Sequence, residues 1–170
     1  MSPPPEALEV ELERLHPAAF GWAVACCGSD RLAAEDVLQA SYLKVLDGRA
    51  RFDGRSSFRT WFFSVVRRTA AEHRRRNALW RIWPLSLLGA AADGRPDPDA
   101  AVVRAETTRR LLAALGRLPR RQREMLYLVF YQDLSIAEAA DVAGISLGTA
   151  RTHYERGKAA LRKWLDGEHA

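Results

Sequence analysis

The spacing of apolar residues predicts helices along most of the chain, and no segment alternates apolar and polar residues as a strand does. Apolar residues recur at intervals of three and four, the repeat of a helix with one buried side. The predicted helices cover residues 6–27, 31–46, 57–76, 99–115, 120–132, 134–143 and 147–164. The residues expected to face a core include Leu32, Val37, Ala40, Leu43 and Leu46 of the second helix and Met125, Leu126, Leu128, Val129 and Tyr131 of the fifth. Pro17 falls inside the first and predicts a kink or restart there. The predicted fold class is therefore all-α.

A turn-rich stretch divides these helices into two groups. Residues 89–100 contain Asp93, Gly94, Pro96 and Pro98 and few large apolar side chains. Such a composition is typical of a linker. We therefore expect two small helical domains, residues 1–88 and 101–170, joined by residues 89–100. The apolar segment 80–88 either packs on the first domain or serves a partner, and the sequence leaves both open.

Residues 134–158 have the pattern of a helix-turn-helix. Ser135 opens a short amphipathic helix, and Gly144 follows it where a tight turn favours a residue that accepts positive φ. Ile145 is an apolar plug, and Ser146 can cap the second helix. A plain helical hairpin with a solvated face is the simpler alternative, but it does not require cap, glycine and plug together.

The second helix of this motif has two predicted faces. The face expected to pack inward holds Leu147, Ala150, Tyr154 and Leu161. The opposite face holds Arg151, Thr152, Glu155, Arg156 and Lys158. Arginine donates to guanine edges or phosphates, and glutamate can accept from cytosine. This mixture predicts a recognition helix in a DNA major groove.

Positive charge is concentrated outside the helix-turn-helix, in residues 51–83. The chain has a net charge of +5, but residues 51–83 alone hold nine arginines against Asp53 and Glu72. The predicted helix 57–76 buries its aromatic side and leaves arginines on the exposed side and at its end. So many like charges exceed what a helix terminus needs, since they repel one another. We therefore expect a second nucleic-acid contact in the first domain.

The sequence contains no motif that indicates catalysis. It has no glycine-rich phosphate loop, no serine elbow, and four scattered histidines. Cys26 and Cys27 are adjacent, which favours neither a disulfide nor a metal site, and a reduced cytosolic chain fits. We see no signal peptide and no apolar run long enough to cross a bilayer. We expect a cytoplasmic binding protein with no enzymatic activity, no cofactor and no small-molecule substrate.

Two motifs in this order resemble the extracytoplasmic-function (ECF) sigma factors of bacterial RNA polymerase. Residues 34–39 (AEDVLQ), 42–44 (YLK) and 51–62 (RFDGRSSFRTWF) resemble conserved region two of that family. Residues 115–124 (LGRLPRRQRE), 134–138 (LSIAE) and 144–149 (GISLGT) resemble region four. The resemblance covers nearly the whole chain, and the two motifs together are more specific than either alone.

The resemblance implies a role for each matching residue. Binding to the clamp helices of the polymerase β′ subunit would use Asp36, Gln39, Tyr42 and Leu43. Single-stranded minus-ten DNA, with one base flipped out, would be held by Phe52, Asp53, Arg55, Ser56, Ser57, Arg59, Arg67, Arg68, Arg74 and Arg75. The duplex minus-thirty-five element would be read by Ser146, Gly148, Thr149, Arg151, Thr152, Glu155 and Arg156. Flipping a base costs a few kcal/mol, which a basic pocket with aromatic stacking can offset in part.

The sequence departs from the family in several places. Ala40 stands where an acidic residue is usual, and Leu46 where a tryptophan is common. Gly157 stands where an alanine is usual, and a glycine there weakens the helix by roughly 1 kcal/mol. These departures affect polymerase affinity and promoter sequence rather than the class.

Two other functions are weighed against a sigma factor. A stand-alone helix-turn-helix regulator explains residues 134–164 but leaves the helix that begins Phe-Arg-Thr-Trp unexplained. A helical adaptor or anti-sigma-like binder would carry its arginines merely as solvated charge. The resemblance also implies an anti-sigma factor as a partner, since many members of this family are held by one.

Overall fold

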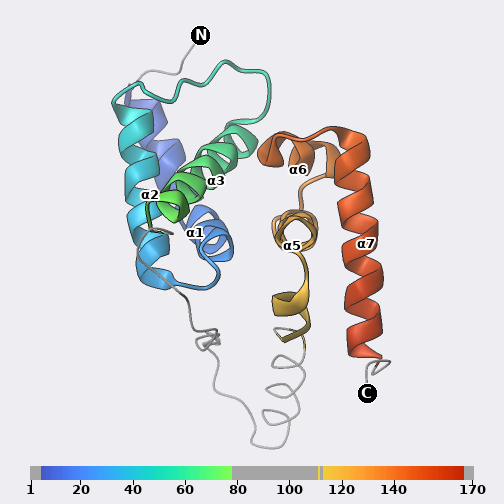
Figure 1. Cartoon of the computed structure of the whole chain (residues 1–170). Coiled ribbons are helices and arrows are strands. Elements are labelled where there is room, and N and C mark those ends of the chain that lie inside the picture. Colours follow the sequence, from blue (N-terminus) through green and yellow to red (C-terminus); the bar gives the residue numbers. More distant parts are fainter. Residues whose placement is uncertain (1–4, 78–110, 112, 167–170) are drawn as a thin grey trace, which may run out of the picture.

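The structure, a computed structural model, describes residues 5–77, 111 and 113–166, and every regular element within them is helical (Figure 1). The elements are α1 (Pro5–Cys26), α2 (Arg31–Leu46), α3 (Phe58–Asn77), α5 (Arg120–Leu126), the π-helical turn η1 (Tyr127–Tyr131), α6 (Ile136–Ala143) and α7 (Leu147–Leu165). The all-α prediction is confirmed. The predicted linker 89–100, the 80–88 segment and most of the predicted helix 99–115 lie outside the described residues, so the domain boundaries stay predictions.

Helices α1, α2 and α3 pack on one another around an apolar core. Trp22 of α1 is fully buried, and its Nε1 donates to the carbonyl oxygen of Phe63 at 3.0 Å. Phe62 and Phe63 of α3 are also fully buried. Helix α1 continues through Pro17, so the predicted restart is wrong. Burial of Leu15 and Trp22 on either side of the proline favours one continuous helix.

Helix α2 packs through a different face from the one predicted. Its buried residues are Ala34, Val37, Leu38, Ser41 and Val45. Three leucines expected to face the core are instead exposed, namely Leu32, Leu43 and Leu46. The helix carries apolar residues on two stripes, and periodicity alone could not tell which stripe meets α1 and α3.

The segment after α5 is helical as predicted, but it changes from an α-helix to a π-helix. Residues 127–131 form the π-helical turn η1, and Asp133 follows with a positive φ of 49°. Met125, Leu126 and Leu128 are buried as expected, whereas Tyr131 is 72% exposed. A π turn shifts the angular positions of the residues after it, so the regular repeat assigned Tyr131 to the wrong side.

The helix-turn-helix has the predicted caps. Ser135 Oγ accepts from the backbone N–H of Glu138, and the Glu138 carboxylate accepts from the Ser135 N–H at 2.9 Å, which is a complete capping box. Gly144 ends α6 with φ of 63°, and Ser146 Oγ accepts from Thr149 N–H at 3.2 Å. These local bonds fix where α6 ends and α7 begins.

The two groups of helices share one core. The first-turn end of α3 approaches α6 (Figure 1), and these helices pack together. A single buried cluster includes Trp22 and Phe63 from the first group and Met125 and Leu128 from the second. The chain therefore folds with its predicted minus-ten region against its helix-turn-helix.

Candidate nucleic-acid interface

Helix α7 presents the predicted recognition residues to solvent. The side chains of Arg151, Thr152, Glu155 and Arg156 are exposed, and they share one side of the helix because residues three and four apart are neighbours on a helix. The helix packs inward through Ala150 and Gly157. The predicted residues in the first turn and its cap are also exposed, namely Ser146, Gly148 and Thr149. Leu147 was predicted to pack inward, but this prediction is wrong because the residue is 40% exposed.

The loop before α3 folds over an aromatic cluster. Phe52 contacts Phe58 edge to face, with ring centroids 5.4 Å apart, and its centroid lies 5.3 Å from that of Trp61. All three rings are half-buried. The sequence left the role of Phe52 open, and here the ring packs in the cluster while one part stays accessible. Ser57 caps α3, because Ser57 Oγ accepts from the Thr60 N–H at 3.1 Å.

The rest of this loop is polar and open. Asp53 and Arg55 are exposed and form an ion pair of 3.2 Å across the turn at Gly54, which has φ of 76°. Ser56 is half-buried and Ser57 is exposed. The loop thus combines a partly accessible aromatic platform with donors and a cation, the groups that hold a single-stranded base.

The predicted arginine face of α3 is only partly free. Arg68 and Arg75 are exposed, as expected for a surface that meets DNA. Arg59, Arg67 and Arg74 are not, because each donates to another part of the chain. Arg74 Nη1 donates to the Cys26 carbonyl oxygen at 2.7 Å, and burial lowers the pKa of its guanidinium from the ordinary value.

Arg59 and Arg67 reach across to the second group of helices. Arg59 Nη2 donates to the backbone oxygen of Gln132 at 2.5 Å and to its Oε1 at 2.9 Å. Arg67 Nε donates to Glu124 Oε2 at 3.1 Å. Sequence reasoning missed Gln132 and Glu124. Gln132 is a polar residue directly after an apolar run, whereas Glu124 is one charged residue among several in residues 120–124, so the sequence marks neither as a partner of an arginine.

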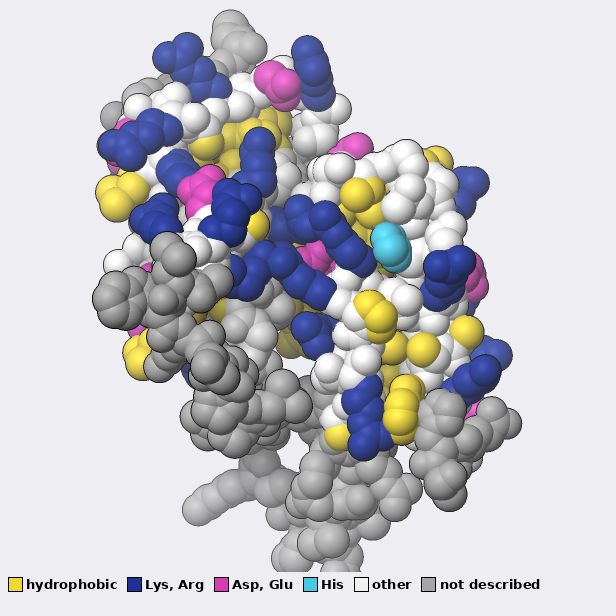
Figure 2. Space-filling model, in the orientation of Figure 1, with side chains coloured by type: hydrophobic (Ala, Val, Ile, Leu, Met, Phe, Trp, Pro, Cys, Tyr) yellow, Lys and Arg dark blue, Asp and Glu magenta, His cyan; other side chains and the backbone are white. Residues whose placement is uncertain are grey.

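Glu124 is the centre of a buried charge cluster. Its side chain is 2% exposed and lies within 3.5 Å of three guanidinium groups, those of Arg67, Arg120 and Arg121. A carboxylate so deeply buried is stable only when it is paired and hydrogen-bonded. Figure 2 shows Lys and Arg side chains gathered across the middle of one face, with acidic side chains among them.

The exposed face of α2 carries three of the four predicted polymerase contacts. Asp36, Gln39 and Leu43 are exposed, and they continue a stripe with Leu32 and Leu46 at alternating intervals of four and three residues. This is the repeat of a helix that packs along another helix. The leucines expected in the core thus belong to an unpartnered face, named here the α2 stripe.

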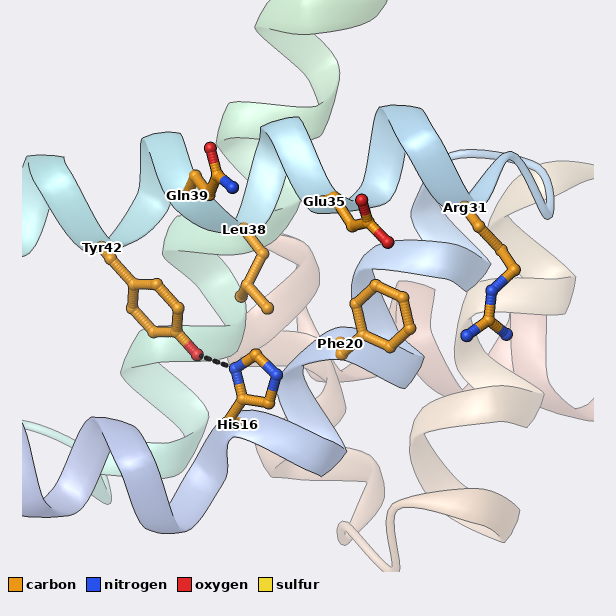
Figure 3. A pocket seen from close by; sticks show the side chains of 7 residues that line it. All are labelled: His16, Phe20, Arg31, Glu35, Leu38, Gln39 and Tyr42. Atoms are coloured by element: carbon orange, nitrogen blue, oxygen red, sulfur yellow. Dashed lines mark hydrogen bonds between the residues drawn. The ribbon is translucent and has the colours of Figure 1, made fainter.

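Tyr42 lies on a different side of α2. It lines a groove of about 360 Å³ between α1 and α2, with its hydroxyl 2.9 Å from His16 Nδ1 (Figure 3). Burial raises the pKa of Tyr42 to about 12, so the phenol stays protonated. Gln39 borders this groove as well, together with Phe20 and Glu35 (Figure 3). The predicted residues on α2 are therefore divided between the α2 stripe and the neighbouring groove.

Among the described residues, no group of three or more His, Cys, Asp and Glu side chains is arranged to hold a metal ion. None of their helices is both long and apolar enough to cross a membrane.

The fold and the polar surface of α7 define a helical DNA-binding protein of the helix-turn-helix class. Residues 12–79 match the model of the family "Sigma-70 region 2", and residues 108–161 match that of the family "Sigma-70, region 4". The chain is 33% identical over 144 residues to "ECF RNA polymerase sigma factor SigX" of Bacillus subtilis, covering 81% of this chain and 73% of that one. It is 32% identical over 140 residues to "ECF RNA polymerase sigma factor SigC" of Mycobacterium tuberculosis, covering 82% and 74%.

A solved structure shares the fold. The sigma factor RpoE of Bartonella quintana, solved in complex with the anti-sigma factor NepR, has a TM-score of 0.74 at 22% identity and covers 95% of this chain and 98% of that one. The chain belongs to the ECF sigma factors of bacterial RNA polymerase. These are transcription initiation factors, and the resemblance described from the sequence is confirmed.

Proposed function

We propose that this sigma factor uses α7 to read the minus-thirty-five element, the loop before α3 with the arginines of that helix to hold the minus-ten strand, and α2 to bind core polymerase. The observation that carries the proposal is the exposed stripe of Arg151, Thr152, Glu155 and Arg156 on a helix whose first turn is capped by Ser146. Donors and one acceptor on a single face suit base edges in a major groove.

The minus-ten assignment is supported by the composition of the loop. Phe52 offers part of an aromatic ring, Arg55 a cation and Ser56 a hydroxyl, on a segment anchored by the aromatic cluster. Base stacking on an aromatic ring contributes about 1–3 kcal/mol per base, enough to offset much of the cost of unstacking. Replacing Arg68 and Arg75 by alanine should flatten the salt dependence of single-strand binding.

The polymerase assignment is supported by the α2 stripe. Exposed leucines on either side of Asp36 and Gln39 suit a partner helix that buries apolar surface and accepts polar contacts at the centre. Leu43→Glu should abolish core-dependent initiation. Leu165→Glu, at an exposed leucine near the end of α7, is the matched control and should leave initiation intact. Equal loss in both variants would refute the role of the α2 stripe.

The decisive experiment is transcription of fragmented genomic DNA by bacterial core polymerase with and without this chain. New discrete transcripts should appear only with the chain, and their aligned start sites should define both promoter elements. Arg151→Ala should then cost about 1–3 kcal/mol at the minus-thirty-five site if Arg151 reads a base edge. Arg162→Ala, exposed in the last turn of α7, is its control.

The same experiment tests the alternative functions. If core polymerase gains no initiation while the chain alone shifts particular duplexes, it is a stand-alone helix-turn-helix regulator. If it binds no nucleic acid at all, an interaction protein is the better description. In this role the chain catalyses no reaction itself, and it acts in the cytoplasm together with the polymerase. An anti-sigma factor is a further proposed partner, supported by the two neighbours RpoE and CnrH, which were solved with NepR and with the cytosolic domain of CnrY.

A further inference from the structure

Helix α3 carries a single acidic residue, and it lies within the arginine face of that helix. Glu72 comes four residues after Arg68 and three before Arg75. Arg76 follows it by four residues, with its Nη2 3.9 Å from Glu72 Oε2. Residues at these intervals are neighbours on a helix, so the acid belongs to the surface proposed to hold the minus-ten strand. Its side chain is 37% exposed, so its charge can be felt by a strand bound there.

The carboxylate has opposite effects on the helix and on DNA. An acid between arginines stabilises a helix that would otherwise carry only like charges on that side. The same negative charge repels the phosphates of a bound strand. The acid that suits the helix therefore opposes the proposed binding surface, unless another group cancels its charge.

Lys44 of α2 supplies the cancelling charge. Its Nζ lies 2.6 Å from Glu72 Oε2 and donates to Oγ1 of the buried Thr69 at 3.1 Å. These two acceptors lie one turn apart on α3 and fix the ammonium group beside the carboxylate. Because both charged side chains are partly exposed, such a pair contributes little to stability. Its larger effect is on the charge of the arginine face.

We propose that Lys44 is a positioning residue for minus-ten binding, which neutralises Glu72 and leaves the exposed arginines of α3 available to DNA phosphates. The inference rests on the proposed role of those arginines. Without Lys44, the carboxylate repels the strand and pairs with neighbouring arginines instead. Lys44 directly follows Leu43 of the α2 stripe, so the helix proposed to bind polymerase also sets the charge of the DNA surface.

The test is a charge cycle made on the full chain bound to core polymerase. Lys44→Met removes the ammonium but keeps a long side chain, and Glu72→Gln removes the carboxylate. The double variant has the net charge of the wild type. A second ion pair supplies the control, since Arg14 and Glu11 lie 2.8 Å apart on α1. Arg14→Met and Glu11→Gln make the same changes in net charge on a different helix.

Each holoenzyme is titrated with a fluorescent single strand that carries the minus-ten sequence found by aligning transcription start sites, and the signal of core polymerase alone is subtracted. The affinity of each chain for core polymerase is measured separately. Lys44→Met should flatten the slope of log affinity against log salt by about 0.7 and weaken strand binding about fivefold at about 0.1 M salt, the change produced by one lost phosphate contact. Adding Glu72→Gln should restore both, and Glu72→Gln alone should not weaken binding. The control variants should match the wild type, and every variant should bind core polymerase as the wild type does.

Three results would overturn the inference. One is weak strand binding that Glu72→Gln does not restore, since Lys44 would then act through the fold and not through the carboxylate. Another is wild-type affinity and slope in Lys44→Met. The third is a loss of strand binding that matches a loss of affinity for core polymerase.

The proposed function is tested separately by replacing Arg68 and Arg75 together by alanine. If this leaves the salt slope unchanged, the arginines of α3 do not hold the strand, and the inference falls with that function. If it flattens the slope while Lys44→Met does not, the proposed function stands and only the role of Lys44 fails.

Discussion

The variant Gly157→Ala sets packing against helix propensity in α7, because the two predict opposite changes in the free energy of unfolding. Seen only as sequence, glycine in the middle of α7 predicts that Gly157→Ala stabilises the protein by about 1 kcal/mol. In the structure Gly157 is buried where α7 crosses α5. A Cβ added there would lie 3.2 Å from Gln122 Cβ, 3.3 Å from Gln122 O and 3.3 Å from Leu126 Cδ1.

These distances decide the sign of the effect. Optimal carbon contacts are about 3.5–4.0 Å, and one of the close neighbours is a backbone oxygen that cannot rotate away. Overpacking of this kind costs about 1–3 kcal/mol, which exceeds the gain in helix propensity. We therefore expect Gly157→Ala to lower the free energy of unfolding by about 1 kcal/mol, the difference between a central overpacking cost of about 2 kcal/mol and a propensity gain of about 1 kcal/mol.

Gly148 supplies a matched control in the same helix. Nothing lies within 4 Å of a Cβ built on it, so Gly148→Ala should stabilise the chain by about 0.4–1 kcal/mol. Urea unfolding followed by circular dichroism measures both variants, and a shift in midpoint without a change in slope reports stability alone. If Gly157→Ala stabilises the chain as much as Gly148→Ala does, the α5–α7 crossing has room for a methyl and the packing argument is wrong.

Three further predictions concern stability and reactivity. Hydrogen bonds from the Ser135 side chain and backbone lower the pKa of Glu138. The ionised Glu138 carboxylate should therefore stabilise the fold slightly at neutral pH, and this contribution should be lost as the pH falls below the usual carboxyl range. Ser135→Ala should cost about 1 kcal/mol and weaken that acid dependence in melting experiments. Burial raises the pKa of Cys27 to about 11, so a thiol reagent at pH 8 should modify the folded chain far more slowly than the urea-unfolded chain; equal rates would contradict that burial. Trp22→Phe removes the side-chain hydrogen bond to the buried Phe63 carbonyl oxygen and should cost about 0.5–1.5 kcal/mol, and an unchanged melting temperature would refute this.

Local signals in the sequence determined the elements and the helix-turn-helix. Ser135, Gly144 and Ser146 act through bonds and dihedral angles within a few residues, so their roles could be predicted without knowing the rest of the fold. The motifs were sufficient for the family as well, because the matching residues are contiguous in the chain. The exposed stripe of α7 followed from helical spacing, because residues three and four apart share one side of a helix.

Tertiary structure alone decided which of two apolar stripes on α2 is buried and where the arginines of α3 point. Leu43 has the same hydropathy whether it faces a core or a partner, so only packing against α1 and α3 could assign it. The partners of Arg59 and Arg67 lie 73 and 57 residues away, a separation that periodicity cannot read. Tyr127, the first residue of the π turn η1, stacks on Trp22 of α1, a contact between distant parts of the chain that helical periodicity cannot predict.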